Sequence, residues 1–199
     1  EARAKVAKAV KLPDGYKITW NGDFENQKRA SARLAQVVPI SVLLIFVILY
    51  VLFGNARDAG LVLTNVPFAA VGGILILLFT HTNFSISAGI GFICLFGICI
   101  QNGVIMLMDI KHFLRHRYAL PEAVTRGMHS RIRSVLMTAM MATLGLMPAA
   151  LSHGIGSESQ RPLATVIIGG LVGATLFTLF IFPLVVERIY SHVNIKKLR

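Results

Sequence analysis

Two neighbouring amides, Gln101 and Asn102, are the strongest polar feature in the apolar part of the sequence, within a long stretch, 59–108, that has no charged residue. Thr138 lies near the start of a similar stretch, 134–157. Amides in apolar surroundings need hydrogen-bond partners, because nothing else replaces their lost hydration. Two interpretations stay open: hydrogen bonds that hold helices together, or polar groups along a path for protons or ions.

Three potential metal ligands, Asp109, His112 and His116, follow at i, i+3 and i+7. This spacing would align them on one face of a helix, as metal sites require. Lys111 and Arg115 lie among them, and their positive charge disfavours a bound cation. We therefore expect a solvated basic face rather than a metal site.

Sulfur-containing residues offer a second candidate. Met137, Met140 and Met141 form an i, i+3, i+4 cluster whose thioethers suit Cu(I) or Ag(I), but methionine also fills gaps in cores, and we expect packing. Cys94 and Cys99 would point about 140° apart on a helix, which disfavours both a disulfide and a shared metal site. The sequence predicts no metal site, no cofactor and no catalytic residue, so an enzyme is not expected.

The distribution of charge indicates which elements carry these residues. Of the 199 residues 55% are apolar and 15% are charged, and the net charge is +11. A soluble fold has no reason to separate charge from apolar residues, whereas a bilayer excludes charge from its centre. The pattern excludes a soluble enzyme, a secreted disulfide scaffold and a disordered chain, and the short basic loops do not indicate nucleic-acid binding. Charge is absent from 34–56, 59–108, 134–157 and 162–186.

These stretches predict an all-α, polytopic membrane protein with a bundle of five transmembrane helices over 34–186. A helix needs about 20 residues to cross the hydrocarbon core, so 59–108 must contain two spans, separated at 81–83. A connector helix is expected at about 121–130, either lying in the headgroup region or simply joining two spans. The expected spans are 34–53, 59–80, 84–108, 134–152 and 162–186.

Loop charge predicts the orientation of this bundle. Lysine and arginine are concentrated in the loop 109–133 and in the tail 187–199, whereas the short loops on the opposite side carry only Arg161. The positive-inside rule places the basic loop and the C-terminal tail in the cytoplasm. The N-terminal segment 1–33 then lies on the other side of the membrane.

That N-terminal segment has the pattern of the end of an exported domain. Residues 1–11 are typical of a short amphipathic helix, and 16–20 alternate as in a strand that ends at Asn21-Gly22. One helix and one strand cannot bury a core, so we expect their partners upstream. A lead-in helix over 24–36 is expected to continue into the first span.

Two ridges of small residues are expected to pack helices closely. Thr165, Gly169 and Gly173 form one ridge on the last span, and Gly145 and Ala149 form another on the fourth. Small residues four positions apart let the backbones of membrane helices approach each other. Such ridges predict a packed bundle without indicating its function.

Several longer motifs resemble a known family. They are Gly-Tyr and Trp-Asn-Gly within 15–22, GFICLFGICIQNGVIM in the third span, RIRSVLMTAMMATLGLMPAAL entering the fourth, and GIGSESQRPLATVIIGG entering the fifth. In this order they resemble the C-terminal portion of resistance–nodulation–division (RND) efflux permeases, in particular the heavy-metal, cobalt–zinc–cadmium branch. The resemblance covers essentially the whole chain. It implies the last five of twelve membrane helices, preceded by a short α/β stub of a periplasmic porter domain.

The resemblance also implies a function and partners. RND permeases are multi-pass proteins of the bacterial inner membrane that work as homotrimers, with a periplasmic adaptor and an outer-membrane channel. They exchange inward proton flow for outward movement of substrate, here a heavy-metal cation. An RND multidrug exporter, or a membrane scaffold that transports nothing, is the alternative. The family's essential acids lie on a helix that this sequence lacks, so the chain alone is expected to be inactive.

The same resemblance suggests roles for three residues. Multidrug members of the family place a relay lysine where Gln101 stands, followed by an asparagine that matches Asn102, and a relay threonine matches Thr138. Gln101 cannot carry charge, so it would support the proton relay only by hydrogen bonding, and the substitution favours the heavy-metal branch. Before the fourth span the family has the motif Arg-x-Arg-Pro, and in this sequence Ser134 stands in place of the proline.

Overall fold

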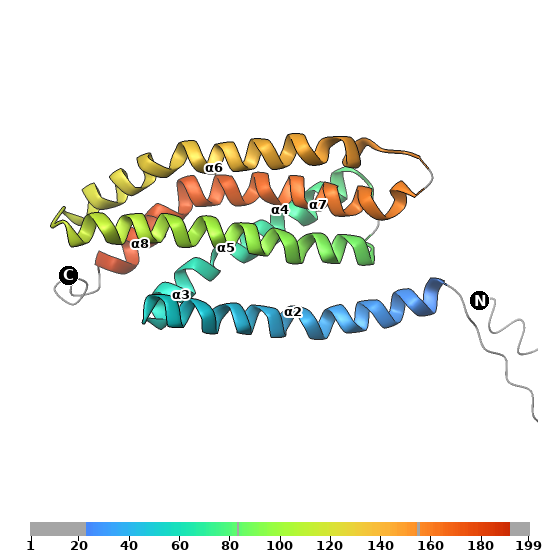
Figure 1. The fold of residues 1–199 in the computed structure, drawn as a ribbon, viewed down its shortest axis with the longest axis horizontal. Coiled ribbons are helices and arrows are strands. Elements are labelled where there is room, and N and C mark those ends of the chain that lie inside the picture. Colours follow the sequence, from blue (N-terminus) through green and yellow to red (C-terminus); the bar gives the residue numbers. More distant parts are fainter. Residues whose placement is uncertain (1–22, 83, 155, 192–199) are drawn as a thin grey trace, which may run out of the picture.

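The computed structural model describes residues 23–82, 84–154 and 156–191. All elements in these ranges are helices, arranged as a bundle elongated along the helix axes (Figure 1). The helix and the strand predicted at 1–11 and 16–20 lie outside the described residues.

In the described ranges, five helical stretches are long and apolar enough to cross a bilayer, which confirms the predicted number of spans and indicates a multi-pass membrane protein. Four of them begin or end within two residues of a predicted boundary, whereas the last extends five residues beyond its prediction at both ends. The stretches are Ala35–Phe53, Ala56–Phe79, Ile86–Arg115, Leu120–Leu151 and Ser157–Ser191.

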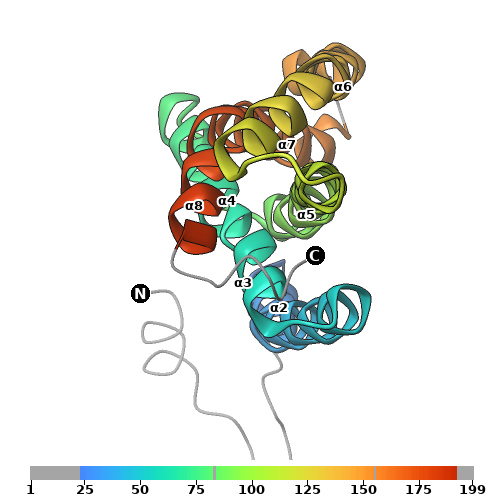
Figure 2. The ribbon, with the colours of Figure 1, turned by 90° about the vertical axis from the view of Figure 1, so that its left-hand side faces the viewer.

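The first span belongs to α2, Asp23–Phe53, in which the predicted lead-in helix and the span form one continuous helix. The helix ends at Gly54, whose φ of 67° lies in the left-handed region that favours glycine. The Gly54 N–H donates to the Tyr50 carbonyl at 2.8 Å and closes the last turn. Helix α2 lies at the edge of the bundle and contacts α3 and α5 (Figure 2).

The second span consists of two helices, α3, Ala56–Leu63, and α4, Asn65–Phe79. They meet at Thr64, where the helix is interrupted for one residue. The cause lies in Pro67, which has no N–H for the carbonyl four residues earlier and whose ring crowds that carbonyl. The interruption leaves Asn65 at the start of α4, inside the bundle.

The third span lies in α5, Ile86–Arg115. Its start is capped by Ser85, whose hydroxyl accepts a hydrogen bond from the Ala88 N–H at 3.2 Å. The predicted break at 81–83 falls in the connection between α4 and α5, where His81 has a φ of 49°.

The fourth span belongs to α6, Leu120–Leu151, a helix of 32 residues. The separate connector expected at 121–130 is corrected here: those residues are the first turns of α6 itself. No glycine or proline interrupts 128–144, so the helix that begins at Leu120 continues through these residues. A methyl group added to Gly127 would lie 2.7 Å from the Ile110 side chain, which shows how closely α6 packs on α5.

The last span has three parts: α7, Ser157–Leu176, a π-helical turn η1, Phe177–Ile181, and α8, Phe182–Ser191. The π turn precedes Pro183, which cannot donate a hydrogen bond to the preceding turn. One extra residue in that turn accommodates the proline without ending the helix.

Two apolar clusters fill the bundle. One joins α3, α5, α6 and α8 near the end of the molecule that holds the α5–α6 connection, and its fully buried members include Met106, Leu107, Ile110 and Phe182. The other joins α4, α5 and α7 and includes Ala69, Leu95, Leu171 and Ala174.

Candidate functional site

The predicted amide pair lies at the outer side of α5. Gln101 is exposed and Asn102 is half-buried, and within the described part of the chain neither side chain has a hydrogen-bond partner. Gln101 belongs to a stripe of exposed residues spaced three, four or seven apart, which marks one face of the helix. The face points away from the bundle core, and on it lie Ile90, Cys94, Gly97, Gln101 and Met108.

Thr138 is exposed on α6, and its hydroxyl donates to the Ser134 carbonyl of its own helix at 2.9 Å. This is the usual hydrogen bond of a threonine inside a helix. The structure therefore does not join Thr138 to Gln101 or Asn102 by hydrogen bonds. Whether the three residues take part in a relay stays a prediction.

A buried charged centre, which the sequence analysis missed, lies at the end of the bundle. The Asp58 carboxylate is 2% exposed, and it accepts hydrogen bonds from Lys111 Nζ at 2.6 Å and from the Tyr190 hydroxyl at 2.6 Å. Lys111 Nζ also lies 5.2 Å from the centroid of the Phe53 ring. The centre ties α3, α5 and α8 together, and every charge in it has a partner.

Local sequence explains why this centre forms. Asp58 lies in the first turn of α3, where a carboxylate interacts favourably with the helix dipole. Lys111 lies beyond the apolar part of α5, and Tyr190 lies near the end of α8. The sequence signal was present, since Asp58 is an acid between two spans, but its partners are 53 and 132 residues away along the chain.

Asp109, one of the three candidate metal ligands, forms an ion pair instead. Its Oδ1 accepts from Arg131 Nη2 at 2.8 Å, its Oδ2 accepts from Arg131 Nε, and the Ser130 hydroxyl donates to Oδ2 at 2.7 Å. This bidentate pair joins α5 to α6. His112 and His116 are exposed, with ring centroids 4.3 Å apart. In the ranges that the structure covers, no three residues of the His, Cys, Asp and Glu types gather in a way that could hold a metal ion.

A second buried polar contact joins α4 to the π turn. The Asn65 side chain is fully buried; its Nδ2 donates to the Val62 carbonyl at 2.9 Å, and its Oδ1 accepts from the Thr178 hydroxyl at 3.0 Å. A methyl group added to Gly103 of α5 would lie 2.6 Å from Asn65 Nδ2. The sequence analysis did not single out Asn65, although a lone amide in an apolar stretch is the signal that would have found it.

The two small-residue ridges differ in their surroundings. A methyl group on Gly173 would lie 3.0 Å from the Gly72 Cα of α4, and one on Gly169 would lie 2.4 Å from the Ile76 Cβ. The Thr165 hydroxyl donates to the Arg161 carbonyl of its own helix at 2.8 Å. On α6, by contrast, a methyl group on Gly145 would meet no atom within 4 Å, and nearby Ala149 and Ala150 are half-buried.

The methionine cluster does not pack in the core, contrary to expectation. Met137, Met140 and Met141 are exposed on α6, to between 53% and 67% of their surface. The expectation failed because α6 is apolar around most of its circumference, and only one side of it contacts α5 and α7. Of the two cysteines, Cys99 is buried and Cys94 is exposed.

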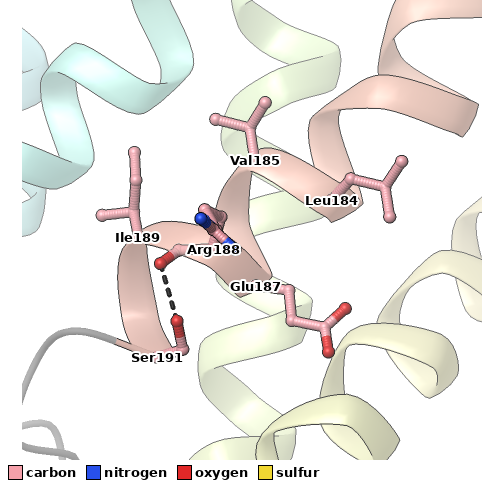
Figure 3. A pocket seen from close by; sticks show the side chains of 6 residues that line it. All are labelled: Leu184, Val185, Glu187, Arg188, Ile189 and Ser191. Carbon is pink, nitrogen blue, oxygen red and sulfur yellow. Dashed lines mark hydrogen bonds between the residues drawn. The ribbon is translucent and has the colours of Figure 1, made fainter.

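Surface hollows lie on the last two spans of the described part of the chain. One, of about 380 Å³, lies between α6 and α7, and Met140 and the buried Thr175 help to line it. The other, of about 560 Å³, lies along α8 and is shown in Figure 3. There the Ser191 hydroxyl donates to the Arg188 carbonyl at 2.8 Å, and the Leu184 and Ile189 side chains provide apolar walls.

Comparison with known proteins identifies the class to which this bundle belongs. The model of the AcrB/AcrD/AcrF family matches residues 1–189. The chain belongs to the AcrB/AcrD/AcrF family, and the resemblance to RND permeases is confirmed.

Particular relatives come from the heavy-metal branch. The chain is 46% identical over 183 residues to the cobalt-zinc-cadmium resistance protein CzcA of Cupriavidus metallidurans, and equally to the nickel and cobalt resistance protein CnrA of that organism. In both cases 92% of this chain and 17% of the relative are covered. A crystal structure of a heavy metal efflux pump matches with a TM-score of 0.76 and 42% identity, over 97% of this chain and 19% of that one. The chain thus spans less than a fifth of the length of these relatives.

Proposed function

We propose that this chain is the C-terminal membrane part of a proton-driven RND transporter that exports heavy-metal cations across the inner membrane. The observation that carries the proposal is the exposed face of α5, on which Gln101 lies without a hydrogen-bond partner in the described part of the chain. An amide at membrane depth needs a partner, so this face is suited to a further helix that carries the acids of a relay.

In this proposal, Gln101, Asn102 and Thr138 support the relay without carrying protons themselves. An amide both donates and accepts hydrogen bonds but does not titrate. Gln101 and Asn102 would therefore orient carboxylates supplied by another helix. The Thr138 hydroxyl already donates to Ser134, but its oxygen can still accept a hydrogen bond.

The proposed substrate is a divalent heavy-metal cation, with cobalt as the first metal to test. Cobalt appears in the printed names of both metal-resistance relatives. In the described part of the chain no group of three His, Cys, Asp or Glu residues could hold a metal ion, so the choice of metal rests on the names of the relatives. The proposed partners are those of the family: two further copies in a homotrimer, a periplasmic adaptor and an outer-membrane channel.

The proposal also assigns each part of the chain to the membrane or to one side of it. Residues 1–33 would be the end of a periplasmic porter domain and its lead-in helix, 34–186 the transmembrane bundle, and 187–199 a cytoplasmic tail. The basic residues near the α5–α6 connection support this orientation, since lysine and arginine favour the cytoplasmic side. A tag reactive only from the cytoplasmic side, placed after residue 199, tests it.

The complete gene that encodes this chain, expressed with its adaptor and channel in a metal-sensitive bacterium, tests the function. We expect increased tolerance to cobalt, lost when the proton gradient is collapsed. We expect no tolerance from the 199-residue chain alone, because the part of it that the structure describes holds no acid at mid-membrane depth. Export by the short chain would show that the proton carriers lie within it. Failure of the complete gene to raise tolerance to cobalt, zinc, cadmium or nickel would favour a scaffold that transports nothing.

Within the complete gene, Asn102→Ala and Thr138→Ala test the relay residues. Both variants should lower cobalt tolerance at normal membrane levels, since each removes a polar group from the proposed path. Unchanged tolerance would reduce the two residues to packing.

A further inference from the structure

The contact between Asn65 and Thr178 is unusual among the threonine hydrogen bonds of this chain. Thr64, Thr125, Thr138 and Thr165 each donate to the carbonyl four residues earlier in their own helix. Thr178, only 1% exposed, donates instead across the bundle to Asn65 Oδ1 at 3.0 Å. The difference coincides with the π turn, since Thr178 is a member of η1.

Asn65 in turn lies directly against α5. It occupies the first position of α4, beside the interruption at Thr64, and its Nδ2 is held by the Val62 carbonyl. Gly103 faces this amide so closely that a methyl group there would lie 2.6 Å from Nδ2 and 3.3 Å from Val62 Cγ1. The fully buried Asn65 amide, held by two hydrogen bonds, thus packs directly against one turn of α5.

The supported turn is the one that carries the proposed relay amides. Gly103 follows Gln101 and Asn102 directly, and two residues along a helix correspond to about 200° of rotation. Gly103 is buried while Gln101 is exposed, so Asn65 contacts the inner side of a turn whose outer side presents Gln101. A change in the Asn65 contact would rotate or lift that outer side.

We infer that Asn65 and Thr178 are positioning residues, which set the orientation of the α5 turn carrying Gln101 and Asn102 and couple it to the π turn of the last span. This inference rests on the proposed function, because the orientation matters only if the two amides serve a relay. Two backbone irregularities meet at this contact, the interruption at Thr64 and the π turn, and a glycine, Gly103, packs against it. π turns inside α-helices are frequent at functional sites.

The test compares two threonines of the same span in the complete transporter, reconstituted into vesicles with a proton gradient and cobalt as the transported ion. Thr178→Val removes the hydroxyl that reaches Asn65 at nearly constant shape. Thr165→Val removes the hydroxyl of another buried threonine, 5% exposed, that serves only its own helix. We expect Thr178→Val to lower the maximal transport rate about three- to tenfold, with an unchanged half-saturating cobalt concentration. Thr165→Val and the conservative Thr178→Ser should stay within about twofold of the parent rate.

A second pair of variants keeps the inference testable if Thr178→Val fails to reach the membrane. Gly103→Ala forces a methyl group against Asn65, whereas Gly60→Ala adds one where no atom lies within 4 Å. Gly103→Ala should lower the maximal rate and Gly60→Ala should not. Equal rates within both pairs, in a parent that transports cobalt, would overturn the positioning role alone. A parent that transports no cobalt, zinc, cadmium or nickel would overturn the proposed function and this inference with it.

Discussion

Helices α6 and α7 lie side by side, and each carries small residues four positions apart, Gly145 and Ala149 on α6 and Gly169 and Gly173 on α7. In the last span, 56% of the most apolar stretch is buried inside the chain, and in α6 only 6% is. The α7 glycines meet the backbone of α4, while Gly145 meets no atom within 4 Å.

The spacing of small residues therefore indicates that a helix can pack closely, but it does not determine which helix it packs against. In a bilayer, lipid tails are as apolar as leucine, so an apolar helix face gains little from burial itself. What holds α7 in place is the close approach that its glycines permit. Helix α6 is held mainly in its N-terminal half, where its buried residues and the Asp109–Arg131 ion pair lie.

We expect the largest loss of stability from substitutions at the buried charged centre around Asp58. Asp58→Ala should lower the free energy of unfolding by about 3–5 kcal/mol, because it leaves Lys111 and Tyr190 without their buried partner. The matched change Glu122→Ala breaks an ion pair with Arg126 on α6 whose side chains are about half exposed, and it should cost less than about 1 kcal/mol. Detergent-purified full-length protein, unfolded by heat, provides the measurement. Equal losses would show that the Asp58 centre is open to water.

A smaller loss of stability is expected from substituting glycines, at the contact of α4 with α7 and on α6. Gly72→Ala places a methyl group 2.8 Å from the Gly169 carbonyl oxygen and 3.1 Å from the Gly173 Cα. Because these are backbone atoms, α4 and α7 must separate, at a cost of about 1–3 kcal/mol. Gly145→Ala should leave the unfolding temperature unchanged or raise it slightly, since alanine favours helices. If Gly145→Ala destabilises the complete protein as much as Gly72→Ala, then the α6 ridge is packed against another helix there.

The smallest effect is expected at the exposed methionines. Replacing both Met140 and Met141 with leucine conserves volume and should change the free energy of unfolding by less than about 0.5 kcal/mol. Cobalt tolerance should also stay the same, because the thioethers hold no ion in the proposed function. A selective loss of silver or copper tolerance in the double variant would instead assign these thioethers to a soft-cation site.

The spans could be predicted from sequence because charged residues are excluded from the bilayer centre, whatever the packing of the helices. The number of spans and the break between Thr80 and Ser85 follow from that constraint together with the length of helix that a bilayer requires. The interior contacts could not be predicted in the same way. Asp58 and Lys111 look like ordinary loop charges until the fold brings them within 2.6 Å.

The candidate site was predicted only in part, for a related reason. Gln101 and Asn102 are conspicuous because they are adjacent, whereas Asn65 and Thr178 are single polar residues 113 positions apart. Their pairing depends on the π turn and on the interruption at Thr64, two backbone irregularities that periodicity does not reveal. The exposure of Met137, Met140 and Met141 was missed because apolar composition cannot distinguish a core face from one that faces lipid or another helix.

The continuity of α6 has a mechanical consequence. A helix of 32 residues is about 48 Å long, well beyond the roughly 30 Å of hydrocarbon that it must cross. It therefore acts as a stiff lever: a tilt of about 10° around its middle would move each end by about 4 Å. Arg131, whose ion pair with Asp109 joins α6 to α5, lies only about 7 Å from that middle, so the ion pair would stay close to the pivot while both ends of α6 move.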